Sequence, residues 1–135
     1  MTKEELKKYL WLRRIIKQLE DRREELETEA TRMTVRYSDQ PKGAPYDKDR
    51  MAELVVEMVE LDEKIQAKLA ESYELARKIE EAIGSLPERE QYLMRARYIE
   101  GKSWGQIAAD MHYSWRQTYN IHSKALRALK GIEQS

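Results

Sequence analysis

Apolar residues recur at alternating spacings of three and four along two long stretches of this chain. The first stretch covers residues 3–34, and Arg23 is the one charged residue in its heptad stripe. The apolar members of that stripe are Tyr9, Leu12, Ile16, Leu19, Leu26, Ala30 and Met33. The second stretch covers residues 50–83, and its stripe consists of Leu54, Met58, Leu61, Ile65, Leu69, Ala76, Ile79 and Ile83. This spacing predicts two long helices, each with one apolar face.

The segment between these stretches has the composition of a loop. Residues 35–48, VRYSDQPKGAPYDK, contain two Pro and one Gly. Two long helices joined by one loop are expected to fold back as an antiparallel, coiled-coil-like hairpin, because neither helix can bury its stripe alone. Thr2 and Glu5 form a capping-box pattern at the start of the first helix. Asp47 or Asp49 is expected to cap the second helix.

Three shorter helices are predicted after the sequence GSLP at residues 84–87, which ends the hairpin. Their expected ranges are 87–100, 104–111 and 115–130. Tyr92, Leu93, Ala96 and Tyr98 are predicted to be core residues, and Trp104 is predicted to pack rather than to contact a partner. We therefore expect an all-α chain, with a hairpin for interaction or assembly over residues 1–84 and a helix-turn-helix domain over residues 85–135.

The last two helices fit the template of a helix-turn-helix. Ser103 with Gln106 and Ser114 with Gln117 are capping-box patterns that predict the starts of two helices joined by a very tight turn. His112 stands at the turn position that usually holds a Gly with positive φ, and His is among the residues that tolerate this conformation. The second helix is expected to bury Thr118, Ile121, Ala125, Leu126 and Leu129.

The opposite face of that second helix is polar and aromatic, which is the pattern of a DNA-reading surface. A recognition helix places its N-terminal residues on base edges in the major groove. The residues predicted to read bases are Trp115, Arg116, Tyr119, Asn120 and Ser123. Arg116 suits guanine, Asn120 suits adenine, and Trp115 or Tyr119 suits a thymine methyl or the sugar-phosphate. The residues expected to contact the DNA backbone are Arg97, Lys102, Ser103, Ser114, Gln117, Lys124 and Arg127.

Charge and composition permit this interpretation. The chain has 25 basic and 25 acidic residues, but the part from residue 87 onward carries eight Lys or Arg and five Asp or Glu. That net charge of +3 against −3 for residues 1–86 allows a nucleic-acid partner without requiring one. There is no Cys, which excludes disulfides and thiolate metal sites. No apolar run approaches the roughly 20 residues of a membrane span.

Motifs for catalysis, metals and cofactors are not supported. The GKS at residues 101–103 lacks the preceding Gly and the strand of a phosphate loop. The sequence DKD at residues 47–49 begins like a calcium loop but lacks the Gly and the closing Glu. His112 and His122 have no companion ligands for a metal. No set of nucleophile, base and orienting residue is present. We therefore expect no enzyme, no metal site and no cofactor.

The C-terminal sequence resembles region 4 of sigma-70-type transcription factors over about fifty residues. The shared elements are LPxRE from residue 86, RYxEG from residue 97, Ser103, Ile107-Ala108, Ser114, and Ile121 followed by KALxxL from residue 124. The whole layout, with a long hairpin before YIEGKSW and MHYSWRQ, is similar to region-4-like regulators of bacteriophages and prophages, including late-gene activators of the ArpU and RinA type. The resemblance implies binding to double-stranded DNA in the cytoplasm of a bacterial host and control of phage genes.

Two other functions remain open from the sequence. Small terminase subunits of phages also join a helix-turn-helix to helical assembly segments, so a role in DNA packaging is one alternative. A module that binds host RNA polymerase or a sigma factor, without binding DNA, is the other. The heptad stripes either hold the hairpin together or form a homodimer, and dimerisation would double the phosphate contacts.

Overall fold

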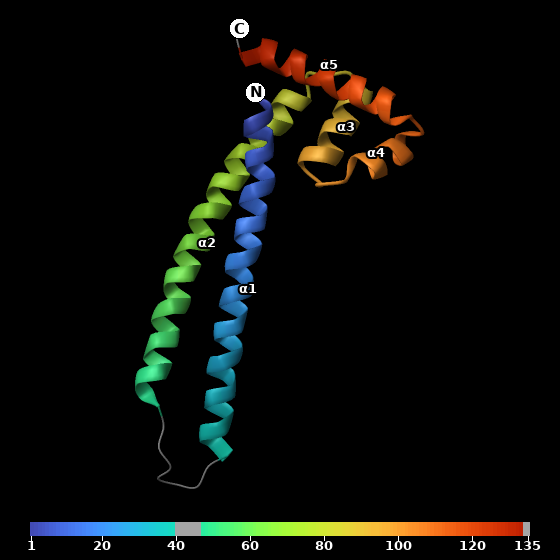
Figure 1. Cartoon of the computed structure of the whole chain (residues 1–135). Helices are drawn as coiled ribbons and strands as arrows, with labels where there is room; N and C mark the ends of the chain where they lie inside the picture. Colours follow the sequence, from blue (N-terminus) through green and yellow to red (C-terminus); the bar gives the residue numbers. More distant parts are fainter. Residues whose placement is uncertain (40–46, 134–135) are drawn as a thin grey trace. The chain divides into compact units, whose positions relative to one another are not determined.

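The protein is an assembly of helices without strands over the residues that its structure describes. The structure, a computed structural model, describes residues 1–39 and 47–133 (Figure 1). The helices are α1 (Lys3–Asp39), α2 (Lys48–Ile83), α3 (Glu88–Tyr98), α4 (Trp104–Met111) and α5 (Trp115–Glu133). The predicted all-α class is therefore confirmed. None of these helices combines the length and the apolar character needed to cross a membrane.

The segment 35–48, predicted to be a loop, is helical at both of its ends. Residues 35–39 continue α1, and Lys48 is already part of α2, so the prediction is wrong at both ends. The stretch 35–39 contains no Gly or Pro, and the first residue biased against helix is Gln40, because it precedes Pro41. The rest of the predicted loop, residues 40–46, lies outside the described residues. The Asp47 side chain accepts a hydrogen bond of 2.9 Å from the backbone N–H of Arg50, so Asp47 caps α2.

The chain divides into two compact units whose limits differ from the expected boundary after residue 84. One unit consists of residues 14–70, and the other combines residues 1–13 with residues 71–135. Leu6, Ile79 and Ile83 are fully buried in the same cluster as residues of α3, α4 and α5. Because a segment of about fifty residues buries little apolar surface by itself, these residues from α1 and α2 complete its core.

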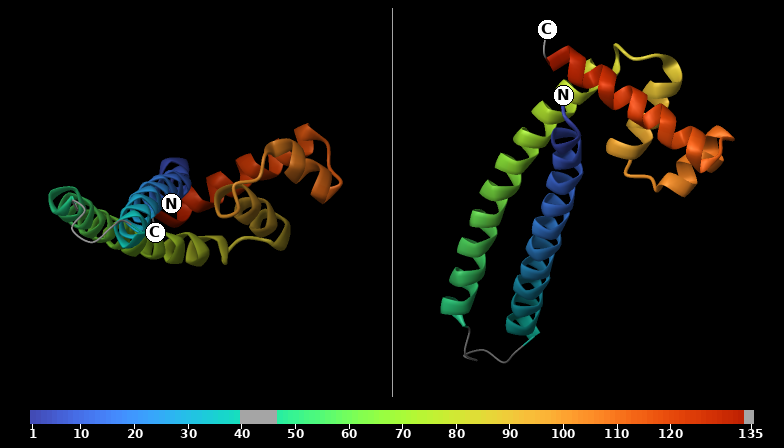
Figure 2. Two further views of the ribbon diagram at one scale, coloured as in Figure 1. Left: turned by 90° about the horizontal axis from the view of Figure 1, so that it is seen from below. Right: turned by 45° about the horizontal axis from the view of Figure 1, so that its top comes forward.

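Within residues 14–70, the two long helices lie side by side and run in opposite directions (Figures 1 and 2). The predicted stripes face each other there. Leu26, Leu54 and Leu61 form a buried cluster, and Leu19, Ala30, Met33 and Met58 pack against it. The antiparallel hairpin predicted from the heptad spacing is thus held together by its own stripes.

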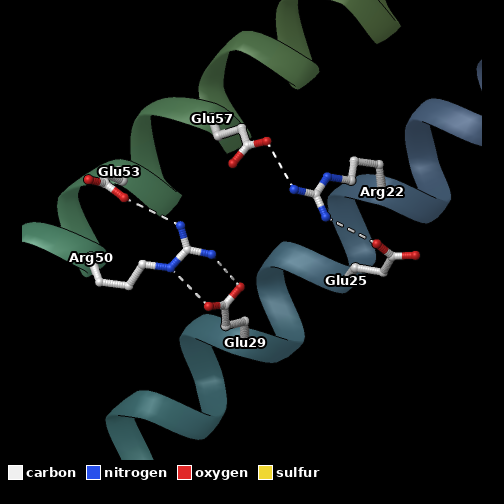
Figure 3. A network of polar contacts seen from close by, with 6 residues as sticks. All are labelled: Arg22, Glu25, Glu29, Arg50, Glu53 and Glu57. Atoms are coloured by element: carbon white, nitrogen blue, oxygen red, sulfur yellow. Dashed lines mark hydrogen bonds and ion pairs between the residues drawn. The ribbon is translucent and has the colours of Figure 1, made fainter. Parts of the chain in front are cut away.

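Ion pairs between α1 and α2 flank this apolar seam (Figure 3). Arg50 of α2 donates two hydrogen bonds, of 2.9 and 2.8 Å, to the carboxylate of Glu29 in α1. Arg22 pairs with Glu57 at 3.1 Å. Exposed pairs of this kind contribute little stability one by one. They do, however, favour this alignment of the two helices over a shifted one, as charged flanking positions do in coiled coils.

Arg23, the charged interruption of the first stripe, takes part in the same kind of contact. Its Nε donates a 2.6 Å hydrogen bond to Asp62 Oδ1 in α2. Its Nη1 also pairs with Glu27 in the next turn of α1. The stripe therefore continues through Arg23 as an ion pair between the helices instead of an apolar contact.

The second unit has its core between α3, α4 and α5. Its buried residues include Leu86, Leu93, Met94, Ala96, Tyr98, Ile107, Ala125 and Leu129. The predicted burial of Leu93, Ala96 and Tyr98 is confirmed, but the predicted burial of Tyr92 is wrong, since 46% of its surface is exposed. Tyr92 lies on the outer side of α3 beside Arg89, Met111 and Tyr113.

Candidate nucleic-acid interface

The turn between α4 and α5 has the backbone geometry that the sequence predicts. His112 ends α4 in the left-handed conformation, with φ 58° and ψ 39°. Its backbone N–H and that of Tyr113 donate to carbonyls of the last turn of α4, Tyr113 to Ala108 at 3.0 Å. These bonds satisfy carbonyl groups that would otherwise lack a partner at the helix end. His112 therefore adopts the left-handed conformation for which this turn usually has a Gly.

Both predicted N-caps, Ser103 and Ser114, are present, and the second belongs to a complete capping box. The Oγ of Ser103 accepts from the backbone N–H of Gln106 at 3.2 Å. At the start of α5 the exchange is reciprocal: Ser114 Oγ accepts from the Gln117 N–H at 3.1 Å, and Gln117 Oε1 accepts from the Ser114 N–H at 2.8 Å. The start of α5 is thereby fixed directly after the turn, which sets the orientation of its first residues.

One face of α5 packs on the rest of its unit. The residues on this face are Thr118, His122, Ala125 and Leu129, all of them buried. The predicted Ile121 and Leu126 are partly buried and pack against the same core. The burial of His122 was not predicted from the sequence, although its spacing of four from Thr118 and three from Ala125 places it on this face.

Tyr98 and His122 form a polar contact inside this core. The Tyr98 hydroxyl lies 2.6 Å from His122 Nε2. Burial raises the pKa of Tyr98 to about 12, and the nearby Arg97 opposes this shift. Burial, with the charges of Lys3 and Arg97, lowers the pKa of His122 to about 4. At neutral pH both groups are therefore uncharged, which suits a hydrogen bond in a buried position.

Trp104, at the start of α4, packs as predicted. Its ring meets the His122 ring edge-on, with centroids 4.5 Å apart. The guanidinium of Arg97 lies over the Trp104 ring, 4.7 Å from its centroid. The two Trp residues flanking the turn are therefore not equivalent, because Trp115 is 67% exposed.

The residues predicted to read bases lie together on the outer face of α5. Trp115 and Tyr119 are 67% and 66% exposed, and Arg116 and Asn120 are also exposed. Ser123, one turn further, is half-buried and borders a cavity with Arg127. A protruding helix face with two large aromatic rings, a guanidinium and an amide can both stack on bases and donate or accept hydrogen bonds.

The residues predicted to contact the DNA backbone fall into three groups. Lys124 and Arg127 are exposed on α5. Lys102 instead pairs with Glu100 at 3.3 Å and Asp110 at 3.4 Å, and Arg97 donates to the Lys102 carbonyl at 3.0 Å. The side chains of the remaining three, Ser103, Ser114 and Gln117, are used as helix caps.

These contacts change what Arg97 and Lys102 can offer a phosphate. A Lys that already has two carboxylate partners carries less free positive charge toward DNA than an exposed one. Within the described residues, no group of three or more His, Cys, Asp or Glu side chains is placed to hold a metal ion.

A short helix, a tight left-handed turn and a capped helix with an exposed N-terminal face define the helix-turn-helix class of DNA-binding fold. Residues 82–131 match the family model described as sigma-70, region 4. The resemblance stated from the sequence is thus confirmed for this C-terminal part, which is less than half of the 135-residue chain. Comparison with curated proteins and with solved structures gave no match.

Proposed function

We propose that this protein is a sequence-specific, DNA-binding transcriptional regulator that acts through its C-terminal helix-turn-helix. The observation that carries the proposal is the outer face of α5. It exposes Trp115, Arg116, Tyr119 and Asn120 directly after a capped turn. The match of residues 82–131 to sigma-70 region 4 supports the same function.

In this proposal each part of the face has a distinct task. Arg116 and Asn120 form bidentate hydrogen bonds to base edges in the major groove. Trp115 and Tyr119 pack on thymine methyl groups or on the sugar-phosphate. Lys124 neutralises a phosphate and so contributes to affinity at every sequence.

The proposal also assigns a biological setting. We infer that the protein is encoded by a bacteriophage or prophage, acts in the cytoplasm of the bacterial host and controls phage genes. The support for this setting is the layout of a long helical hairpin followed by a region-4-like segment, which is similar to phage regulators. Contact with host RNA polymerase is part of the same inference, because region 4 implies such a partner.

The hairpin is proposed to assemble the protein as a homodimer. Its two apolar stripes are used within the hairpin, so a dimer needs another surface. The outer face of α2 offers one, since Val55, Val56 and Val59 are exposed at 47%, 57% and 51% with Ala52 beside them. Four such side chains are few compared with the roughly 20–30 residues on each side of a standard interface, so we expect a weak dimer that DNA reinforces.

The proposed function is tested by selecting bound duplexes from a random DNA library with the full chain. Enrichment of one sequence motif is expected, and its loss in an Arg116→Ala, Asn120→Ala double variant would support the assigned face. Failure to enrich any motif at low salt, together with co-purification of RNA polymerase, would instead favour a polymerase-binding module.

Footprints across the phage genome distinguish the two DNA-binding roles. Sites upstream of phage genes are expected for a regulator. Sites beside a packaging start, with a ring of eight or more copies in sedimentation analysis, would favour the small-terminase function.

A further inference from the structure

A cavity of about 270 Å³ lies beside the N-terminal half of α5. It is lined by Lys3, Trp104, Trp115, Thr118, Tyr119 and His122. Three of these six residues have large aromatic rings, and a fourth is an imidazole. The volume is slightly below the roughly 300–1,000 Å³ of pockets that bury drug-sized ligands. We call it the α5 cavity, and its size and walls suit one flat ring system.

The polar groups around the α5 cavity favour hydrogen-bond acceptors. In the buried pair, the direction of the Tyr98–His122 hydrogen bond depends on the tautomer of His122, and we take the Tyr98 hydroxyl as the donor to Nε2. This tautomer leaves the proton of the neutral imidazole on Nδ1. Within the described part of the chain, Nδ1 has no hydrogen-bond partner. No fully buried side-chain nitrogen or oxygen there lacks a partner, so Nδ1 is accessible from outside. In this tautomer, Nδ1–H of His122 is a donor available to a ligand in the cavity that His122 lines.

The charges near the α5 cavity are positive. Lys3 lines it, and none of its six lining residues is a carboxylate. The guanidinium of Arg97 lies behind one wall, over the Trp104 ring. Both cations lower the pKa of His122, after the larger effect of burial, so their field reaches the imidazole. An anion is stabilised in such surroundings and a cation is not.

We propose that the α5 cavity binds a small planar aromatic anion. Its ring stacks between the indole rings and Tyr119, and its anionic group pairs with Lys3. An acceptor on the ring or on the anionic group accepts a hydrogen bond from Nδ1–H of His122. Stacking on aromatic faces supplies affinity, and the single ammonium supplies the preference for negative charge.

This site gives the ligand a way to control DNA binding. Trp115 and Tyr119 form walls of the α5 cavity and also belong to the face proposed to read bases. A ligand that holds these rings against the cavity withdraws them from DNA, so ligand and DNA compete. This regulatory step rests on the proposed function, whereas ligand binding itself does not.

The first test is a titration of the free protein with indole-3-carboxylate, followed by NMR of the indole N–H groups. The chain has three Trp residues, so each signal is assigned by one Trp→Phe variant. We expect Trp104 and Trp115 to shift, whereas Trp11, which is 59% exposed and lies on α1, does not. Absence of any shift at Trp104 and Trp115 up to millimolar ligand would overturn the proposal.

Uncharged indole and cationic tryptamine test the charge preference on the unaltered protein. We expect affinity to fall about tenfold from the carboxylate to indole, which corresponds to one charge-assisted hydrogen bond, and further for tryptamine. Equal affinity for all three would contradict the role of Lys3. Shifts caused by a single-stranded oligothymidylate but not by indole-3-carboxylate would contradict binding of a small-molecule ligand. They would indicate that a DNA base occupies the α5 cavity.

Matched variants locate the site. Lys3→Gln is expected to remove the tenfold preference for the carboxylate, while Lys7→Gln keeps it. Tyr119→Ala is expected to weaken binding about tenfold or more, whereas replacement of Tyr73, a residue of similar exposure at 68%, by Ala is not. Circular dichroism verifies that each variant is folded. Unchanged binding in both Lys3→Gln and Tyr119→Ala would refute the site.

Competition is measured last, by adding indole-3-carboxylate to a protein–DNA complex. An increase in the apparent Kd for DNA with ligand concentration is expected. If the protein binds no DNA, the NMR titration still decides whether the α5 cavity binds the anion. If the protein binds ligand and DNA without competition, the regulatory step is wrong, but the ligand site in the α5 cavity is supported.

Discussion

Tyr98 and His122 are joined by a hydrogen bond of 2.6 Å between the phenol oxygen and Nε2, and both side chains are buried. Tyr98 ends α3 and His122 lies in the middle of α5. The bond therefore connects the helix that precedes the helix-turn-helix to the helix proposed to read DNA. Both side chains are uncharged at neutral pH, and protonation of His122 in acid is expected to destabilise the folded state.

The first prediction concerns pH. The folded pKa of His122 is about 4, below its ordinary value of 6.5, so the unfolded chain binds this proton more readily than the folded one. The resulting stability is present above about pH 6.5 and is lost as the pH falls toward 4. Between pH 7 and pH 5 we expect the free energy of unfolding to drop by about 2 kcal/mol.

Urea unfolding followed by circular dichroism at both pH values measures this drop. His122→Gln, which keeps a hydrogen-bond acceptor, is expected to abolish most of it, and the exposed His112→Asn is expected to leave it unchanged. The same pH dependence in wild type and His122→Gln would show that other groups carry it.

The turn residue His112 gives a second prediction. Its φ of 58° is costly for most side chains and free for Gly. Gly also increases the freedom of the unfolded chain, which offsets part of this gain, so His112→Gly is expected to raise the free energy of unfolding by 0 to about 1 kcal/mol. His112→Val is expected to destabilise by about 1–2 kcal/mol, because a branched side chain is strained in this conformation. Chemical denaturation of both variants gives the comparison, and a clear loss in His112→Gly would contradict the role assigned to the turn.

Local patterns predicted local structure well in this protein. The three capping-box patterns at Thr2, Ser103 and Ser114 each correspond to a helix start, because their hydrogen bonds involve residues only three apart. The positive φ of His112 followed from its place at the turn position of the helix-turn-helix template, which usually holds Gly. The apolar face of each long helix also followed from its spacing alone.

Contacts between distant segments could not be predicted from such patterns. Leu6 and Ile79 complete the core of the C-terminal unit, yet each lies in a stretch whose spacing indicates only a hairpin. Lys102 was expected to meet phosphate but pairs with Asp110, eight residues away in the next helix. The α5 cavity includes Lys3 from the other end of the chain. All three depend on which elements pack together, and one sequence does not contain that information locally.

A third prediction tests the charged position in the hairpin stripe. Arg23 lies on the face of α1 that packs on α2, and its partner there is Asp62. Removing one partner of a buried ion pair is destabilising, but the Asp62 side chain is 49% exposed, so water can solvate its carboxylate when Arg23 is replaced. We expect Arg23→Leu to leave the melting temperature unchanged or to raise it, and Leu26→Arg, three residues further in the fully buried cluster, to lower it strongly. A marked decrease in Arg23→Leu would mean that the ion pair is required for the hairpin.

A fourth prediction separates capping from DNA contact at Ser114. Its hydroxyl caps α5, so Ser114→Ala is expected to cost about 1 kcal/mol of stability. Ser114→Asp restores the cap but adds a negative charge near the proposed DNA. Ser114→Asp is therefore expected to be as stable as wild type in thermal unfolding and weaker in DNA binding. If Ser114→Asp binds DNA as wild type does, Ser114 is a cap only.

The last prediction separates base reading from backbone contact on α5. Arg116→Ala and Asn120→Ala are each expected to weaken binding to the selected sequence by about 1–3 kcal/mol and to leave binding to unrelated DNA nearly unchanged. Lys124→Ala is expected to weaken binding to both kinds of DNA and to reduce the slope of log K against log salt by about 1.

Fluorescence anisotropy across a range of salt concentrations measures both quantities. Lys64→Ala, an exposed cation on the hairpin, serves as the control and should change neither. Specificity arises at base edges and salt dependence at phosphates. Arg116→Ala and Asn120→Ala are therefore expected to change the sequence preference, and Lys124→Ala the salt slope. If Arg116→Ala changed the salt slope but kept the sequence preference, the guanidinium would be a phosphate contact, and the reading face would have to begin at Tyr119 and Asn120.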